Sequence, residues 1–297
     1  MFPTLFKALR LGPPGTGFCR EFSVGRHRIL APRNHQIDTI RQRWNRYDVA
    51  LGEISRAVFS KYPKATAIDI GANIGDSAAL INKHHDIPVL CVEGNQEFLP
   101  ILRENIARLG PHVELEESFV ADDDTHVDTS RIESRDGTAS VTRALDAVSS
   151  ASTVTTKSLT SIVQQHPQFA RPRLLKIDTD GFDFLIISNA LDFLDDVRPV
   201  VFFEYYLEGS KDAQQQGLAA VEGLFSTGYR KHLVYDNFGN FLISVDTPQK
   251  FVELNAYLKS NKKHGTAVYY FDVCSFHQHD ADLFDRIRRE EVEASAA

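Results

Sequence analysis

The chain has 297 residues, of which 42% are hydrophobic and 25% charged, and this is the composition of a globular protein able to bury a large core. Its apolar runs are far shorter than the ~20 residues of a membrane-spanning helix, and a net charge of -7 argues against a nucleic-acid-binding protein. The three cysteines, Cys19, Cys91 and Cys274, fit neither a disulfide framework nor zinc-ligand spacing, which favours a reducing, cytoplasmic setting.

The first 46 residues are basic, with nine Lys or Arg against two acids. This basic segment could be an arm that contacts an anionic substrate, or it could be an organelle transit peptide. We favour a third interpretation, an N-terminal elaboration that docks on an acidic core. Alternation over residues 22–30 predicts a strand or hairpin arm, and spacing over 37–59 predicts helices, with Asp48 capping the second. Trp44 and Tyr47 fit either a core or a wall for a sugar. We therefore divide the chain into an arm with helices, 1–62, and a main domain, 63–297.

A repeated pattern of strand, turn and helix begins near residue 64. Short, continuously apolar strands are separated by amphipathic helices, which is typical of a parallel sheet covered on both faces. The predicted fold is therefore an α/β, doubly wound, Rossmann-like sheet. The predicted strands are 66–70, 89–92, 113–120, 174–177 and 200–203, and the predicted helices are 76–85, 95–109 and 182–194.

Two parts of the chain depart from this pattern. Residues 122–158 are rich in Ser, Thr and Asp and predict an excursion with a short hairpin over the carboxyl edge of the sheet. Beyond residue 229, two β-rich runs joined through 237–240 predict a hairpin, followed by a strand at 267–276 and a helix at 281–293.

The end of the first predicted strand carries a glycine turn. Gly71 and Gly75 permit a tight bend that lets backbone amides approach a ligand, ahead of a helix with a positive dipole end. Glu93 ends the next strand, 22 residues beyond Gly71, where a carboxylate can accept hydrogen bonds from both hydroxyls of a ribose. Together these residues predict a cofactor that contains adenosine.

The spacing of the turn indicates which cofactor this is. A dinucleotide site would have GxGxxG, whereas this chain has GxNxG, with Asn73 where a glycine would admit a pyrophosphate. Asp69 and Asp76 add negative charge, which is costly beside a diphosphate and favourable beside a sulfonium. A nicotinamide-dependent oxidoreductase is therefore the disfavoured alternative.

Four blocks, DIGANIGD, CVEGN, LLKIDTDGFDFLIISNA and RPVVFFEYY, resemble the FkbM family of S-adenosylmethionine-dependent methyltransferases over about residues 65–206. Family members have Lys-Ile-Asp-x-Glu-Gly-x-Glu after the fourth strand, and here residues 176–183 shorten both glutamates to aspartate. The family's Leu-Asp pair ahead of this strand is Leu159-Thr160, without the acid.

The resemblance implies S-adenosylmethionine as the cofactor and assigns its contacts. Its methionine side is lined by Asp69, Gly71, Asn73 and Gly75. Glu93 holds the ribose, and Asn95, the expected cap of the following helix, joins the cofactor set. Asp122 or its neighbours approach the adenine.

Methyl transfer to a hydroxyl needs an aligned nucleophile and a base. We expect Asp178 to orient cofactor or substrate and Asp180 and Glu204 to be the base candidates. The alternative for Asp180 is a cap on the helix that begins near Phe182. These three acids also suit Mg²⁺, but we predict no metal.

The sequence thus predicts a methyltransferase that O-methylates a hydroxyl of a saccharide or small-molecule acceptor, such as a secondary metabolite. The alternative is a non-catalytic scaffold that keeps the fold, indicated by the shortened acids and Thr160. No nucleic-acid partner and no transmembrane segment are expected, and the arm suits either a homodimer or an intramolecular wrap.

Overall fold

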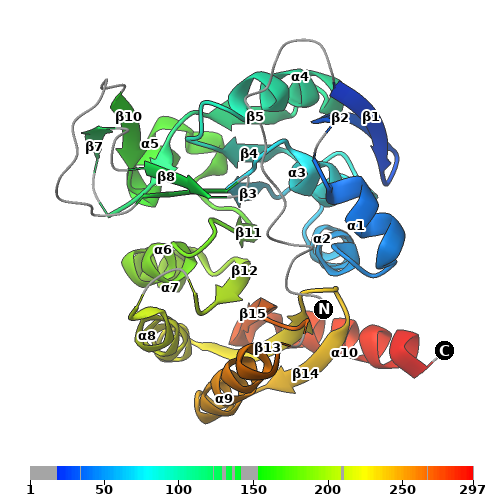
Figure 1. Ribbon diagram of the computed structural model, residues 1–297, viewed down its shortest axis with the longest axis vertical. Helices are drawn as coiled ribbons and strands as arrows, with labels where there is room; N and C mark the ends of the chain where they lie inside the picture. The colour runs from blue at the N-terminus through cyan, green and yellow to red at the C-terminus, as the bar shows by residue number, and fades with distance from the viewer. Residues whose placement is uncertain are drawn as a thin grey trace.

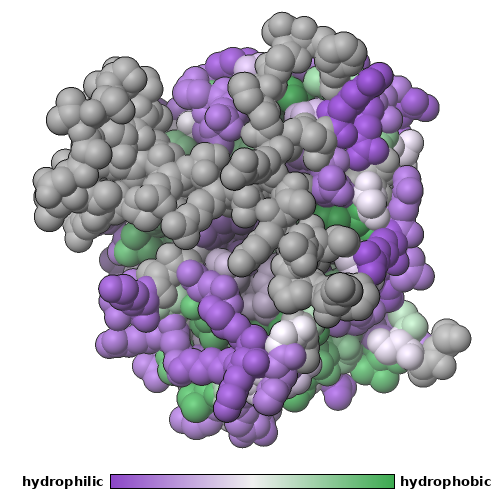
Figure 2. Space-filling model, in the orientation of Figure 1, coloured by the Kyte–Doolittle hydropathy of each residue, from purple (hydrophilic) through white to green (hydrophobic). Residues whose placement is uncertain are grey.

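A computed structural model describes residues 19–33, 35–122, 124–128, 132–135, 138–141, 153–208, 211–265 and 267–296. Residues 1–18, with part of the basic segment, and all of 142–152 lie outside the described residues. Among the described residues, no helix combines the length and the apolar character that a membrane span requires. Figure 2 shows a largely hydrophilic described surface on the face in view, with apolar residues in small separate areas.

An eight-stranded sheet forms the centre of the protein, in the spatial order β14-β13-β15-β12-β11-β3-β4-β5. The strands from β5 to β12 run parallel, and β15 lies antiparallel between β12 and β13. The bounds are β3 Ala67–Ile70, β4 Val89–Val92, β5 Val113–Glu116, β11 Leu174–Ile177, β12 Val200–Tyr206, β13 Tyr229–Asp236, β14 Phe241–Val245 and β15 Tyr270–His277.

Helices cover both faces of this sheet, as Figure 1 shows. Successive strand residues point to opposite faces, so that Ala67 packs into one core and Ile68 into the other. One face carries α1 Ile37–Arg43, α2 Val49–Lys61, α3 Asp76–Ile81, α4 Leu99–Leu109 and α10 Ala281–Ala296. The other carries α5 Leu159–Gln165, α6 Asp183–Asn189, α7 Leu191–Val197, α8 Ala213–Ser226 and α9 Gln249–His264. The predicted doubly wound α/β fold is therefore confirmed.

Smaller β elements lie at the periphery. The arm is a hairpin of β1 Cys19–Val24 and β2 His27–Pro32, and Asn105 of α4 binds both the N–H and the C=O of Leu30, at 2.7 and 2.8 Å. The excursion contributes a three-stranded sheet and a two-stranded hairpin. Their strands are β6 Phe119–Val120, β10 Thr153–Lys157 and β7 Thr125–Asp128, and β8 Ile132–Arg135 with β9 Thr138–Val141.

Several predicted elements differ from those observed. The helix expected over 182–194 is two helices, α6 and α7, which meet at Ala190. The strand expected over 113–120 divides into β5 and β6, which belong to different sheets. Phe119 packs on Gly94, just beyond β4, where an added Cβ would lie 2.3 Å from its ring, so the chain after β5 leaves the central sheet and contacts the segment that follows β4. Asp48 precedes α2 but makes no side-chain cap, because its carboxylate accepts from Arg41 instead.

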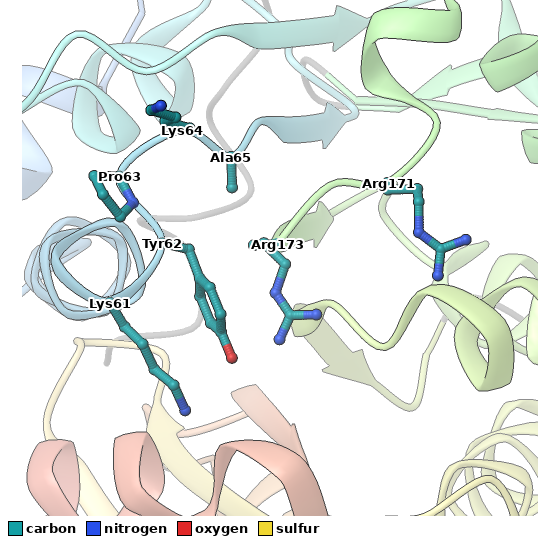
Figure 3. A pocket seen from close by; sticks show the side chains of 7 residues that line it. All are labelled: Lys61, Tyr62, Pro63, Lys64, Ala65, Arg171 and Arg173. Carbon is teal, nitrogen blue, oxygen red and sulfur yellow. The ribbon is translucent and has the colours of Figure 1, made fainter.

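A cavity of about 440 Å³ lies near the starts of β3 and β11, as Figure 3 shows. Its cations are Lys61, Lys64, Arg171 and Arg173. Lys61 and Arg173 both pair with the fully buried Asp280, at 2.9 and 2.6 Å, and so join α2 and the start of β11 to the end of β15. Because ligands of such sheets bind at the carboxyl ends of the strands, the site must be sought at the opposite edge.

Candidate functional site

The glycine turn follows β3 and leads into α3. Gly71 has φ +74° and Gly75 has φ +86°, a region of backbone conformation that favours glycine. A Cβ on Gly71 would lie 1.8 Å from the carbonyl oxygen of Asp178, so the turn packs directly against the loop that follows β11. The two predicted site segments are therefore in contact.

A buried ion pair supports this turn. Asp69 is fully buried, accepts from the Ser77 hydroxyl at 2.5 Å and pairs with the Lys176 ammonium at 3.1 Å. Lys176 also donates to the Gly71 carbonyl at 2.9 Å. Burial alone would lower the pKa of Lys176, but the carboxylates of Asp69 and Asp178 raise it above its usual value. Asp69 thus fixes the turn through its neighbours, and its contact with a cofactor stays a prediction.

Glu93 holds the turn from β4. Its two carboxylate oxygens accept the backbone N–H groups of Asn73, at 2.9 Å, and of Asn95, at 2.7 Å. Burial raises the pKa of Glu93, while these two amide donors lower it. The predicted residues Gly71, Asn73, Gly75, Glu93 and Asn95 are therefore brought together. Asp122 is exposed beyond β6, and its approach to the adenine stays a prediction.

The donors and acceptors here fit the predicted cofactor. The Asn73 carboxamide oxygen and the Asn95 carboxamide nitrogen are buried without a hydrogen-bond partner among the described residues. Such atoms are costly unless a ligand or water satisfies them. An acceptor carboxylate for ribose hydroxyls, two unsatisfied amide groups and nearby acids suit a sulfonium nucleoside, and the contacts of these residues with S-adenosylmethionine stay a prediction.

Three acids converge beside the turn. One carboxylate oxygen from each of Asp178, Asp180 and Glu204 lies within 4.8 Å of the others. Desolvation raises the pKa of Asp180 and of Glu204 well above the usual range, and the neighbouring acids raise both further. Oxygen ligands at this spacing could hold a hard divalent cation. The sequence predicted no metal here, and that expectation stays a prediction.

Asp183 organises this acidic loop. Its carboxylate accepts from the Thr179 hydroxyl at 2.9 Å and from the backbone N–H of Glu204 at 3.3 Å, so it joins the loop to β12. Burial and the adjacent Asp178 raise the pKa of Asp183 to about 6. α6 begins at Asp183 after Phe182, so the alternative that Asp180 caps this helix is wrong. The sequence contained Asp183 within the family block, but its contacts depend on the fold.

Two further titratable groups, the Asp272 carboxyl and the Tyr47 hydroxyl, lie near these acids. Asp272 of β15 is the register partner of Glu204. Its pKa is raised well above the usual range by burial and by Asp178 and Asp48. Burial likewise raises the pKa of the Tyr47 hydroxyl, and the carboxylates of Asp48 and Asp272 raise it further. The segment between α1 and α2 therefore lies over the acids.

A methyl group at Gly71 is expected to destabilise the protein strongly. Gly71→Ala should lower the free energy of unfolding by about 3 kcal/mol, because backbone strain and the clash with Asp178 add together. Gly265→Ala is the matched control, since Gly265 has φ +68° but nothing within 4 Å of an added Cβ, and should lose about 1 kcal/mol. Urea unfolding measures both, and equal losses would contradict the packing.

Neutralising Asp272 is expected to stabilise the protein as the pH rises. Because the pKa of Asp272 is raised in the folded state, the protonated carboxyl favours the folded protein. This contribution is complete below the unfolded-state pKa, near 3.8, and is lost as the pH rises through the folded-state pKa. Asp272→Asn should match wild type near pH 4 and be more stable by about 1 kcal/mol at pH 8. Asp246→Asn, at an exposed acid after β14, should show no such trend. A difference that does not depend on pH would argue against the repulsion.

The sequence matches the methyltransferase FkbM domain over residues 69–265, well over half of the chain. No curated protein matches it.

Solved structures show only distant likeness. The methyltransferase FkbM from Methylobacillus flagellatus KT has 14% identity and a TM-score of 0.39 over 54% of this chain and 37% of that one, so the match spans little more than a third of that relative. An O-methyltransferase from Bacillus cereus in complex with S-adenosylhomocysteine has 12% identity and a TM-score of 0.40, over 75% and 80% of the two chains. A S-adenosylmethionine-dependent methyltransferase from Agrobacterium tumefaciens has 9% identity and a TM-score of 0.43, over 89% and 71%.

The extent of the domain match agrees with the blocks on which the resemblance was based, and with the turn and acids that the fold brings together. The chain belongs to the FkbM family of methyltransferases, and its cofactor is S-adenosylmethionine.

Proposed function

We propose that the protein transfers a methyl group from S-adenosylmethionine to a hydroxyl of a neutral saccharide or small-molecule acceptor. The observation that carries this proposal is the meeting of Asp180 and Glu204 beside the glycine turn that Glu93 holds. Cofactor residues and candidate bases therefore share one edge of the sheet.

The cofactor supplies an electrophilic methyl group on a cationic sulfur. Among the described residues, Asp180 and Glu204 are our candidates to accept the proton of the acceptor hydroxyl, and Asp178 could orient that hydroxyl. Desolvation raises the pKa of both candidate bases, which makes their carboxylates stronger proton acceptors than a free carboxylate. A nearby positive charge favours the ionised form, so the loaded site is the state in which a base is available.

The charge of the site argues for a neutral acceptor. The Asp178 carboxylate helps to raise the pKa values of Asp183, Glu204 and Asp272, so these acids lie close together and an anionic acceptor would meet repulsion. Three tyrosines, Tyr206, Tyr269 and Tyr270, neighbour Glu204, and the rings of Tyr269 and Tyr270 are 5.1 Å apart. Rings together with carboxylates can cover the apolar face of a sugar and accept its hydroxyl protons.

The alternative is a non-catalytic scaffold, and one reason for it is that Thr160 replaces the acid of the family's Leu-Asp pair. Thr160 is exposed in the first turn of α5, and the acids that converge come instead from β12 and from the loop between β11 and α6. The substitution at Thr160 therefore leaves the acidic group intact, whereas the shortened acids Asp180 and Asp183 still belong to it, and the scaffold stays the alternative. The expectations of a cytoplasmic location, a homodimer and a boundary between residues 62 and 63 stay predictions.

Cofactor binding is expected to depend on Glu93. Glu93→Gln should weaken the binding of S-adenosylhomocysteine by roughly 10- to 100-fold, because charge-assisted hydrogen bonds are lost at the ribose and at the turn. Titration calorimetry measures this loss. Glu97→Gln is the control, since Glu97 is an exposed acid four residues further on. Unchanged affinity in Glu93→Gln would remove the basis of the cofactor site.

Methyl transfer is expected to depend on Glu204. Protein incubated with labelled S-adenosylmethionine should label a pool of neutral saccharides, and Glu204→Gln should lower kcat by about 100-fold or more while the affinity for S-adenosylhomocysteine stays unchanged. Glu208→Gln, an acid of the same segment that pairs with Lys262, should keep its kcat. Tight cofactor binding without transfer to any acceptor pool would favour the scaffold, and loss in both variants would argue against Glu204 as the base.

A further inference from the structure

We propose that Arg41, which lies outside the FkbM domain, binds the carboxylate of the cofactor's methionine moiety and makes α1 part of the cofactor site. The inference depends on S-adenosylmethionine being the cofactor, but it does not depend on the acceptor or on catalysis.

Arg41 reaches the glycine turn from the N-terminal segment. One guanidinium nitrogen, Nη2, lies 3.0 Å from the Asp48 carboxylate and 3.2 Å from the Asp76 carboxylate. Asp76 directly follows Gly75, so the guanidinium lies beside the end of the turn. The side chain of Arg41 is only 16% exposed, and its position is therefore fixed by packing as well as by charge.

The second terminal nitrogen of Arg41 has no acceptor. Nη1 is buried and makes no hydrogen bond among the described residues. An unsatisfied donor on a buried cation is costly, and a ligand that supplies an oxygen would remove the cost. Because guanidinium presents its donors in a planar fork, a carboxylate is the group that it matches best.

Few groups near the turn could bind the carboxylate of the methionine moiety. The methionine moiety carries a carboxylate, whereas the turn is surrounded by the acids Asp69, Asp76 and Asp178. In the described structure, Lys176 and Arg41 are the cations that pair with these acids. The Lys176 ammonium already has close oxygens from Asp69 at 3.1 Å, Gly71 at 2.9 Å and Ile70 at 3.4 Å, which accounts for its three protons. Arg41 is thus the cation with a donor to spare.

The junction between α1 and α2 holds Arg41 in place. Asp48 adopts φ +61°, an uncommon conformation for a residue other than glycine, and this turns its carboxylate toward Arg41. Burial raises the pKa of Asp48 to about 6, and the Arg41 charge opposes that rise. A strained residue that anchors an arginine with an unused donor is consistent with a binding role.

The test compares two ligands that differ in one carboxylate. Calorimetry would measure the binding of S-adenosylhomocysteine and of S-adenosyl-3-thiopropylamine, which has the same nucleoside and amine without the carboxylate. Arg41→Ala should weaken S-adenosylhomocysteine by roughly 10- to 100-fold and the carboxylate-free ligand by less than about threefold. Arg43→Ala is the matched control, because Arg43 is an exposed arginine of the same helix, and it should change neither affinity.

Three results would overturn the proposal. Equal losses for both ligands would mean that Arg41 only supports the turn, and unchanged affinity for both would mean that it makes no contact. If wild type bound neither ligand, the cofactor assignment would fall together with this inference. Binding that depends on Arg41 in a protein without methyl transfer would support the inference and count against the proposed function.

A conservative variant covers the case in which Arg41→Ala fails to fold, since that change leaves Asp48 and Asp76 without their partner. Arg41→Lys keeps the positive charge but replaces the fork with a single ammonium group. It should weaken S-adenosylhomocysteine by at least about threefold and leave the carboxylate-free ligand unchanged. Equal affinities of Arg41→Lys and wild type for both ligands would overturn the assignment.

Discussion

The buried pair between Asp69 and Lys176 is the interaction on which the site depends. These residues are register partners on β3 and β11, the neighbouring strands whose ends carry the glycine turn and the acidic loop. Burying two charges costs desolvation free energy that the attraction between them often does not recover, so the pair is weak evidence for stability. What it does provide is position, because Lys176 also binds the Gly71 carbonyl and draws the turn against the loop.

The buried acids of the site lower the stability of the folded protein but provide groups for ligand binding and proton transfer. Burial raises the pKa values of Glu204, Asp180 and Asp272, and the carboxylates near each of them raise these values further, so their ionised forms are disfavoured in the folded chain. A site preorganised for a cationic donor and a hydroxyl acceptor needs such groups before the ligands arrive. The surrounding core, with sheet residues packed on both faces, tolerates this local cost.

Local signals in the sequence predicted the parts of the fold that local physics determines. Apolar runs identified β4 and β11 with their observed bounds, because strands buried on both faces are mostly apolar, and the one charge in β11, Lys176, is buried in an ion pair. α8 and α9 were not predicted, and α9 buries only Phe251, Asn255 and Leu258, so its apolar period is faint. Glu93 was found from its spacing to the turn. Asp272 was not, since β15 runs antiparallel and meets Glu204 only through the sheet register, which no local pattern encodes.

The junction between α1 and α2, which lies near the acids, is held at both of its ends. This explains how a segment outside the family domain can belong to the site of that domain. Gly239, in the turn between β13 and β14, approaches the Arg46 carbonyl so closely that a Cβ would lie 2.0 Å from it, and the rings of Trp44 and Phe238 are 4.8 Å apart. At its other end the same segment is tied to Asp76 through Arg41. The α1–α2 junction therefore spans from the hairpin of the domain to its glycine turn, and any movement that loosens one contact is resisted by the other.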